Sequence, residues 1–447
     1  MSTMKWFGDF HIHSRFSRAT SKELTLPVLD EWARKKGIAV MGSGDFTHPQ
    51  WLEELKANLV SAPEEGLFVL RRGTTQNGTQ NNAEQGATRF LLTVEISSIY
   101  SKAGKVRKVH TILFAPSFEA AEAINTRLSW SGNLASDGRP IIGIDAKDVA
   151  KAAFKADPSC MVVPAHAWTP WFSIFGSMSG FDSLEECFEE LTPKILAIET
   201  GLSSDPQMNW RVSALDSVAL MSNSDSHSAR KIGREANVLE GEMSYPAIVE
   251  AFRTGAPVRA AEREKSPCRL LGTIEFFPEE GKYHYDGHRL CKVRWTPHQR
   301  KENNGKCKVC GRSVTVGVLS RVDDLADRPE GTKPEGAPHF RSLVPLAEII
   351  ADVLGVGTGT KAVESKYNAL IAAFGNEFAV LLDAPAEQIA KESSPQIAEG
   401  IRRVRDRKLH IEPGYDGEFG KVKIFEEGER KAISNQESET SNQASLF

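Results

Sequence analysis

Two histidines near the start of the chain alternate with apolar residues. In residues 8–14 (GDFHIHS), His11 and His13 are two positions apart. On a β-strand, residues two apart lie on the same face, so both imidazoles would leave one face while Phe10 and Ile12 leave the other. Two imidazoles on one strand face form half of a metal site. Such a pair also occurs at ordinary strand ends, so a metal site is indicated only if the rest of the chain supplies further ligands.

Similar polar residues follow several apolar runs further along the chain. Most are histidines or carboxylates at or near the end of a run that predicts a buried strand, and His110 lies inside such a run. Taken singly, each has a structural explanation, such as a salt bridge, a core histidine or a helix cap. Together they are too regular for independent accidents, and imidazole mixed with carboxylate suits zinc, manganese or iron. These residues are Asp45, His48, Glu95, His110, His166, Asp225 and His227.

The ligand series offers enough donors for two or three divalent ions. Ions a few ångströms apart with a bridging hydroxide are suited to attack on phosphate esters, because they lower the pKa of the nucleophilic water and neutralise the leaving oxygen. The sequence therefore predicts a phosphoesterase.

The elements that must position these ligands alternate between apolar β-rich runs and helical runs. Strands are expected at 38–41, 90–94, 109–114, 161–163, 195–198 and 219–221, and helices at 25–36, 146–156 and 183–190. This alternation favours an α/β fold with a parallel barrel, whose catalytic residues sit at the carboxyl ends of the strands.

Length and composition limit the classes of protein. A chain of 447 residues is expected to form two or three domains. No run approaches the roughly 20 apolar residues of a membrane span, and the first residues lack the apolar core of a signal peptide. We therefore expect a cytoplasmic protein without a membrane partner. The formal charge of −4 decides nothing about nucleic acid, because binding depends on a local basic surface.

A small cysteine-bearing segment follows the barrel region. His288 and Cys291 form one knuckle, and Cys307 and Cys310 form another about fifteen residues later. Two such knuckles can close a tetrahedral structural zinc site, with His284 as an alternative fourth ligand. The segment is basic, which favours contact with a nucleic-acid backbone, although a solvated surface has the same composition. Its candidate DNA contacts are Arg289, Lys292, Arg294, Arg300 and Lys301.

Residues 338–409 show helical periodicity, with runs at 344–354, 362–374 and 387–391. Arg402, Arg403 and Arg405 in this part are a second set of candidate phosphate contacts, or else a solvated helix end. Residues 428–447 are polar, and we expect disorder there.

The ligand series resembles the metal-binding motifs of the polymerase-and-histidinol-phosphatase (PHP) domain. This family has a distorted (β/α)7 barrel with a multinuclear metal site, so the resemblance implies two or three barrel ions, zinc, manganese or magnesium. The residues that match in order are His11, His13, Asp45, Glu95, His110, His166, Asp225 and His227. In many members a histidine directly follows the second-motif aspartate. Here Phe46 follows Asp45, so the choice between Asp45 and His48 stays open.

The barrel, the zinc segment, the helical part and residues 412–420 (EPGYDGEFG) together resemble the endonuclease Q family to about residue 425. The resemblance implies a DNA-repair endonuclease that cuts 5′ to uracil, hypoxanthine, xanthine and abasic sites by attack of a metal-bound hydroxide. The catalytic residues would be Asp225, His227, Glu95 and His166. The substrate would be damaged DNA, double-stranded and also single-stranded.

An enzyme that inspects a base must extrude it into a pocket with aromatic or apolar walls. Aromatic residues crowd the loop after His166, where they could form such walls or the barrel's own lid packing. The pocket candidates are Trp168, Trp171, Phe172 and Glu199, of which Glu199 could also bind or orient a metal ligand.

The last five residues, QASLF, resemble the peptide with which bacterial DNA enzymes dock into the sliding clamp. Gln443, Leu446 and Phe447 would be the anchors, and a flexible tail suits such a tether.

The predicted division is a PHP barrel at 1–265, a zinc module at 266–325, a helical DNA-binding domain at 326–425 and a disordered tail at 426–447. Two alternatives remain: a small-molecule phosphatase of the histidinol-phosphatase kind, and a nucleic-acid-binding adaptor with an inactive barrel. The sequence leaves open the metals, the preferred base and the oligomeric state.

Overall fold

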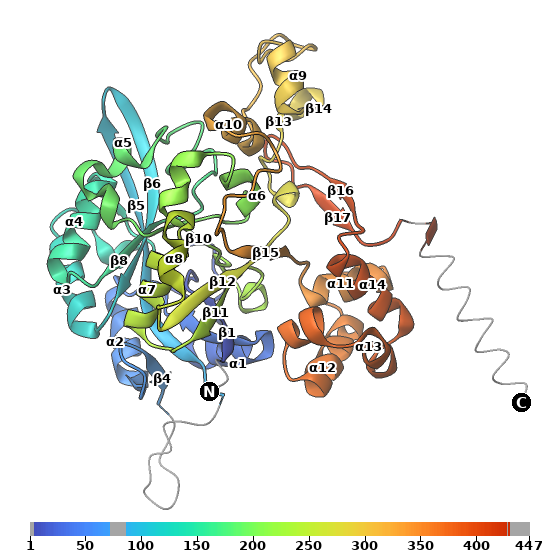
Figure 1. Cartoon of the computed structure of the whole chain (residues 1–447), viewed down its shortest axis with the longest axis horizontal. Helices are drawn as coiled ribbons and strands as arrows, with labels where there is room; N and C mark the ends of the chain where they lie inside the picture. The colour runs from blue at the N-terminus through green and yellow to red at the C-terminus, as the bar shows by residue number, and fades with distance from the viewer. Residues whose placement is uncertain (1–3, 72–85, 427, 430–447) are drawn as a thin grey trace, which may run out of the picture.

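The computed structural model describes residues 4–71, 86–426 and 428–429 of the 447-residue chain. Most strands join one sheet, and helices pack outside it (Figure 1). The strands of this sheet are β1 (Lys5–Asp9), β2 (Ile38–Gly42), β3 (Leu59–Ser61), β4 (Phe68–Leu70), β5 (Arg89–Lys102), β6 (Lys105–Ala115), β7 (Ile141–Ile142), β8 (Met161–Pro164), β11 (Ala236–Gly241), β12 (Cys268–Glu275) and β15 (His339–Ser342). The fold is therefore mixed α/β, as expected.

Strand β1 lies inside this sheet, parallel to β2 and antiparallel to β11. β2 is parallel to β5, whereas β5 and β6 form a long antiparallel hairpin and β6 is antiparallel to β8. Two further strands, β9 (Ala197–Glu199) and β10 (Ala219–Met221), pair in parallel. The expectation of a parallel barrel is wrong at several strand pairs, because β1–β11, β5–β6 and β6–β8 among them are antiparallel.

One apolar core collects side chains from strands all around the sheet. It includes Phe10, whose ring lies 6.1 Å from the rings of both Phe114 and Phe252, and residues of β2, β8, β9, β10 and β11. Strands that share one interior must curve around it. The number of seven βα units stays a prediction.

The helices outside the sheet match the expected runs in part. They are α1 (Leu26–Lys36), α2 (Pro49–Asn58), α3 (Phe118–Leu128), α4 (Ala146–Ala156), α5 (Leu184–Phe188), α6 (Pro206–Asn209), α7 (Tyr245–Gly255) and α8 (Ala260–Arg263). Helix α1 begins with a proline in its first turn and ends at Gly37, whose φ of 90° suits glycine. The run expected at 183–190 is helical only to Phe188 and continues as a 3-10 turn.

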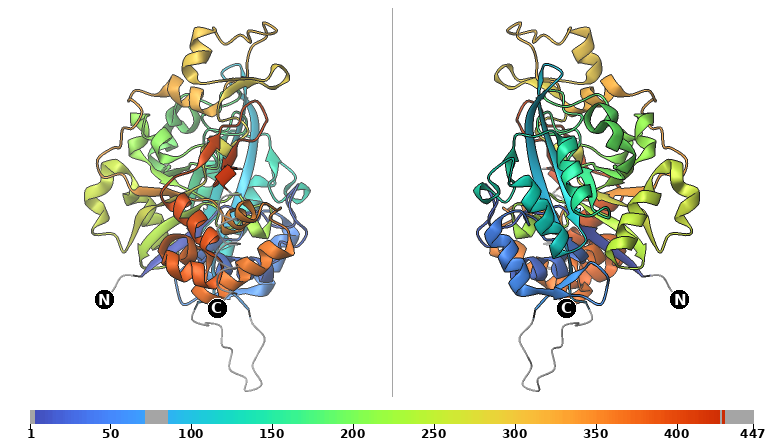
Figure 2. Two further views of the ribbon diagram at one scale, coloured as in Figure 1. Left: turned by 90° about the vertical axis from the view of Figure 1, so that its right-hand side faces the viewer. Right: turned by 90° about the vertical axis from the view of Figure 1, so that its left-hand side faces the viewer.

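The zinc segment projects from the body at the end opposite the N-terminus (Figures 1 and 2). It contains β13 (Asp286–His288), β14 (Val293–Trp295), α9 (Pro297–Glu302) and α10 (Val318–Leu325). The helical part contains α11 (Leu346–Leu354), α12 (Lys361–Phe374), α13 (Ala386–Glu392) and α14 (Pro395–Arg405), and the β16 (His410–Glu412) and β17 (Lys421–Lys423) hairpin follows.

The helical part packs against the beginning of the chain. The Phe7 and Phe378 ring centroids are 4.4 Å apart, and the buried Lys36 ammonium lies 2.7 Å from the Glu377 carboxylate. The large sheet also continues past residue 265, because β12 pairs with β11 and β15 pairs with β12. The described part of the chain contains no helix long and apolar enough to cross a bilayer.

Candidate metal centre

Two groups of ligand atoms come together, and both include Glu95. His11, His13, Glu95 and Asp225 form one group, and Glu95, His110 and His166 form the other. Within each group the ligand atoms lie within 4.8 Å of one another. Glu95 lies on β5 and His110 on β6, and the others lie in the loops that follow β1, β8 and β10, so the fold assembles the site from residues far apart in sequence.

The two oxygens of Glu95 divide between the two groups. Oε1 lies 2.6 Å from Nδ1 of His110 and 3.0 Å from Nε2 of His166. Oε2 lies 3.3 Å from Nε2 of His13 and 3.6 Å from Nε2 of His11. A carboxylate placed in this way can bridge two ions.

A second layer of carboxylates orients the two N-terminal histidines. Nδ1 of His11 lies 3.0 Å from Oε1 of Glu199, and Nδ1 of His13 lies 3.1 Å from Oδ1 of Asp45. Each ring therefore turns its Nε2 toward the cluster, which is the arrangement of a metal-ligating histidine with an outer-shell partner. Glu199 also accepts the backbone N–H of His166 and the amide of Asn223.

The chemistry of these donors fits divalent ions. Nε2 of His11 is buried and has no hydrogen-bond partner among the described residues, which is costly unless a metal or water occupies the space beside it. Burial lowers the pKa of His110 to about 4, so its ring is neutral near pH 7, as metal binding requires. Burial opposes the ionised form of Asp225, but His11 and His13 hold the pKa of Asp225 well below its usual range.

The backbone at the site is strained at several positions. Asp45, His166 and Asp225 have φ values of 51°, 29° and 45°, and Phe172 beside His110 has 61°. Residues other than glycine rarely adopt positive φ, and such outliers concentrate at functional sites.

Three predicted ligands lie outside the two groups. Oδ2 of Asp45 accepts hydrogen bonds from the backbone and hydroxyl of Ser14 and from Ser17, while its Oδ1 contacts His13. His48 stacks on Phe16 at 4.4 Å and precedes α2. His227 lies at the rim, with its ring 4.6 Å from that of His13 and Nδ1 donating to the carbonyl of Asp225 at 2.9 Å.

Arg139 is a site residue that the sequence did not reveal. Its guanidinium donates to Oε2 of Glu95 at 3.1 Å. It lies in a loop between α3 and α4 with no recognisable motif, so no signal in the sequence pointed to it.

The predicted base-pocket residues separate into two kinds. Trp168 is 1% exposed, packs on Phe175 and donates to Asn209 at 2.7 Å, so in this structure it is part of the core. Glu199 is fully buried as the partner of His11. Trp171 and Phe172 are half-buried beside the metal centre, and the Phe172 ring lies 4.9 Å from that of His110.

The four predicted zinc ligands come together. The ligand atoms of His288, Cys291, Cys307 and Cys310 lie within 4.8 Å of one another, with Sγ of Cys310 3.4 Å from Nδ1 of His288. Burial opposes ionisation of Cys307, but the backbone N–H groups of Cys310 and Val309 lower the pKa of its thiol to about 6. The alternative ligand His284 is buried outside this group.

Some of the side chains predicted to contact DNA form hydrogen bonds or ion pairs within the protein, whereas others are exposed. Arg405 donates to three backbone carbonyls of residues 380–384, and Arg402 and Arg403 form ion pairs with Glu399. Arg300 and Lys301 pair with Asp324 and Asp323. Three others are exposed, and among the described residues no carboxylate lies within 4.0 Å of their charged side-chain groups: Arg289, Lys292 and Arg294.

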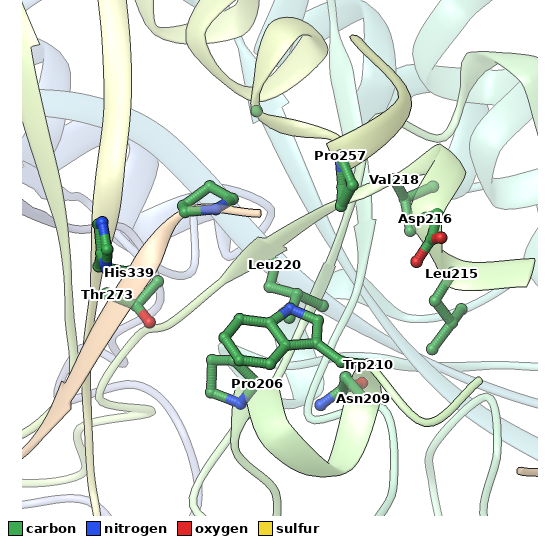
Figure 3. Close-up of a pocket in the computed structure, with 12 residues that line it drawn as sticks. Pro206, Asn209, Trp210, Leu215, Asp216, Val218, Leu220, Pro257, Thr273 and His339 are labelled. Atoms are coloured by element: carbon green, nitrogen blue, oxygen red, sulfur yellow. The ribbon is translucent and has the colours of Figure 1, made fainter. Parts of the chain in front are cut away.

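A small cavity lies near α6, away from the metal ligands. Figure 3 shows Trp210 at its centre, between Pro206 and Leu220. Its volume is about 20 Å³, enough for about one water molecule, so it is a packing gap and not a substrate site. The predicted clamp peptide, residues 443–447, lies outside the described residues.

The fold and the shared-carboxylate site define the class of a metal-dependent hydrolase. The chain is 32% identical to the lesion-specific endonuclease PfuEndoQ from Pyrococcus furiosus, with a TM-score of 0.79 over 95% of this chain and 96% of that one. A solved complex of endonuclease Q with a 27-mer duplex carrying an abasic lesion is also 32% identical, with a TM-score of 0.78 over 95% of this chain and 98% of that one. The chain belongs to the endonuclease Q family.

Curated sequence relatives are uncharacterised. The chain is 28% identical to YqxK of Bacillus subtilis over 94% of this chain and 99% of that protein. It is 34% identical to MJ0043 of Methanocaldococcus jannaschii over 58% of this chain, but spans only 31% of that longer protein. Residues 345–408 match the family described as the MJ0043 C-terminal domain.

Proposed function

We propose that the protein is a DNA-repair endonuclease that hydrolyses the phosphodiester bond 5′ to deaminated bases and abasic sites. Uracil, hypoxanthine and xanthine are the proposed bases. Support comes from the 32% identity to a lesion-specific endonuclease and from the solved family complex with an abasic duplex. The proposal includes a (β/α)7 PHP barrel, a zinc module and a helical DNA-binding domain.

The observation that carries the proposal is the division of the Glu95 oxygens between two ligand groups. Divalent ions held there would lower the pKa of a nucleophilic water and neutralise the leaving oxygen. Zinc, manganese and magnesium are the candidate ions, and a third ion would need a ligand such as His227.

Side chains of this site have distinct roles in the proposal. Asp225 and His227 are 24% and 32% exposed, whereas the side chains of His11, His13 and Glu95 are almost fully buried. The substrate phosphate therefore approaches from the side of Asp225 and His227. Because Nδ1 of His227 donates to a carbonyl, its Nε2 is free to bind an ion or to exchange a proton with the substrate. His166 and Glu95 would bind the ion on the opposite side of the site.

The test is a gel assay of end-labelled duplexes that carry one uracil, hypoxanthine, xanthine or abasic site, with manganese, magnesium or zinc. We expect a nick on the 5′ side of the lesion, loss of the nick in Asp225→Ala, and an unchanged nick in Asp216→Asn. Asp216 is a matched control because it pairs with Arg328 outside the metal centre. Hydrolysis of a phosphate monoester without any nick would favour the phosphatase, and neither activity would favour the adaptor.

We also propose that Gln443, Leu446 and Phe447 dock the chain to a bacterial-type sliding clamp. The support is the sequence QASLF alone. Deleting Leu446 and Phe447 should abolish binding to the purified clamp while nicking of lesion DNA persists; equal clamp affinity would refute the idea.

A further inference from the structure

An exposed aromatic side chain lies on the loop between β16 and β17. Phe419 is 69% exposed, and Nζ of Lys282 lies 4.5 Å from its ring centroid. One exposed apolar residue is ordinary on a protein surface. Phe419 differs because other aromatic residues connect its surroundings to the metal centre.

The series of aromatic contacts begins beside His110, in the ligand group of Glu95, His110 and His166. The Phe172 ring lies against His110, and the neighbouring Trp171 ring lies 5.3 Å from that of Tyr283. Both Trp171 and Tyr283 are half-buried. We call Phe172, Trp171, Tyr283 and Phe419 the aromatic track.

Backbone hydrogen bonds hold the Phe419 loop beside the segment of Tyr283. The N–H of Gly417 donates to the carbonyl of Lys282 at 2.9 Å, and the N–H of Tyr285 donates to the carbonyl of Gly414 at 2.9 Å. The track is therefore built from three segments that are distant in sequence, and it is fixed by the fold.

Two lysine side chains lie over rings of the aromatic track. Nζ of Lys108 lies 5.2 Å from the Phe172 ring centroid, and Lys282 lies over Phe419. Neither lysine has a carboxylate partner within 4.0 Å in the described parts of the chain. An apolar peptide would gain nothing from these charges, whereas a polyanion with flat bases would use both the rings and the lysines.

We propose, on the basis of the endonuclease function above, that the aromatic track binds unpaired nucleotides that adjoin the reacting phosphate. Their bases stack on the exposed rings, and their phosphates lie near Lys108 and Lys282. Stacking tolerates any sequence, because every base has a π-face. The track thus suits a strand opened around a lesion, in which the flanking bases have lost their partners.

The test compares Phe419→Ala and Phe419→Trp with wild type in the full chain loaded with metal. The probes are an undamaged single-stranded oligonucleotide containing 2-aminopurine and a fully paired duplex of the same sequence. Binding is measured by fluorescence anisotropy, and stacking by quenching of 2-aminopurine. Trp130→Ala is the matched control, because Trp130 is 79% exposed and follows α3, on the opposite side of the molecule from β16 (Figure 1).

Phe419→Ala should weaken binding of the single strand about tenfold and reduce the quenching, because one base loses its stacking partner. Phe419→Trp should restore both, while duplex binding and the Trp130→Ala variant stay within twofold of wild type. The proposal is overturned if wild type does not bind the single strand, if Phe419→Ala binds it as tightly, or if single strand and duplex weaken equally. Because the probes are undamaged, these results are independent of the nicking assay that tests the endonuclease.

Discussion

The carboxylate of Asp45 lies 3.1 Å from Nδ1 of His13, on the side of the ring away from the ligand cluster. Ser14 and Ser17 hold the same carboxylate with three hydrogen bonds. Asp45 therefore orients a ligand in this structure, and the histidine that it orients presents Nε2 to Glu95 and Asp225.

Asp45→Asn should weaken metal binding without removing a ligand atom. The amide cannot hold the His13 ring and its proton as a carboxylate does, and loss of an outer-shell partner usually costs about 10- to 100-fold in metal affinity. Isothermal titration calorimetry of the metal-free protein with manganese measures this change in affinity. Asp216→Asn is the control, and an unchanged affinity in Asp45→Asn would show that the contact does not matter.

Glu95→Gln should affect both halves of the centre, because its two oxygens face different ligand groups. His110→Ala removes a donor from one group only. Elemental analysis should therefore show loss of all barrel metal in Glu95→Gln but retention of part of it in His110→Ala. Equal losses in the two variants would contradict a shared carboxylate.

Cys307→Ser should release one zinc ion and loosen the zinc module, because the small apolar cluster around Trp295, Cys307 and Val314 cannot replace a metal. We expect nicking of lesion DNA to require a higher protein concentration, while the barrel metal content stays the same. Zinc release can be followed with a chromogenic chelator. Loss of barrel metal in this variant would mean that the two sites are not independent.

Glu275 makes stability depend on pH. Burial raises its pKa to about 8, although Thr273, Thr200 and Ser222 donate to it. An unfolded glutamate has a pKa near 4.5, so between about pH 4.5 and 8 the folded state keeps a proton that the unfolded state has released. Stability should therefore fall as pH rises through this range.

Thermal unfolding at pH 6 and pH 9 measures this effect. We expect Tm to be lower at pH 9, and Glu275→Gln to reduce the difference because glutamine does not titrate. Exposed Glu387→Gln is the control. An equal pH dependence in wild type and Glu275→Gln would exclude Glu275 as its source.

The sequence predicted the ligands that end apolar runs, because a run followed by a histidine or carboxylate marks a strand end. It could not choose between Asp45 and His48, since both follow one strand and the choice depends on contacts with Ser14 and Ser17. Nor could it assign Trp168 to the core, because exposure of a loop aromatic depends on packing from distant segments.

The strand expected at 90–94 is longer than its apolar run indicated. β5 continues to Lys102 through the buried Ser97 and Ser98, whose hydroxyls interrupt the apolar pattern. Ser97 nonetheless contacts a predicted metal ligand, because its hydroxyl lies 3.1 Å from Nε2 of His110. Arg139 reaches Glu95 across 44 residues of chain, a contact that only the tertiary fold creates.

The position of β1 has a consequence for how the chain folds during synthesis. Residues 5–8 pair with residues 237–240, so the first strand to leave the ribosome must wait for more than half of the chain before one of its edges is covered. Contacts so distant in sequence form slowly, and an open strand edge invites association with other chains. His11 and His13 follow this strand, and Asp225, which lies 3.1 Å from His13, comes 212 residues later in the chain than His13. The nascent protein therefore cannot complete the ligand group of His11, His13, Glu95 and Asp225 before Asp225 has been translated.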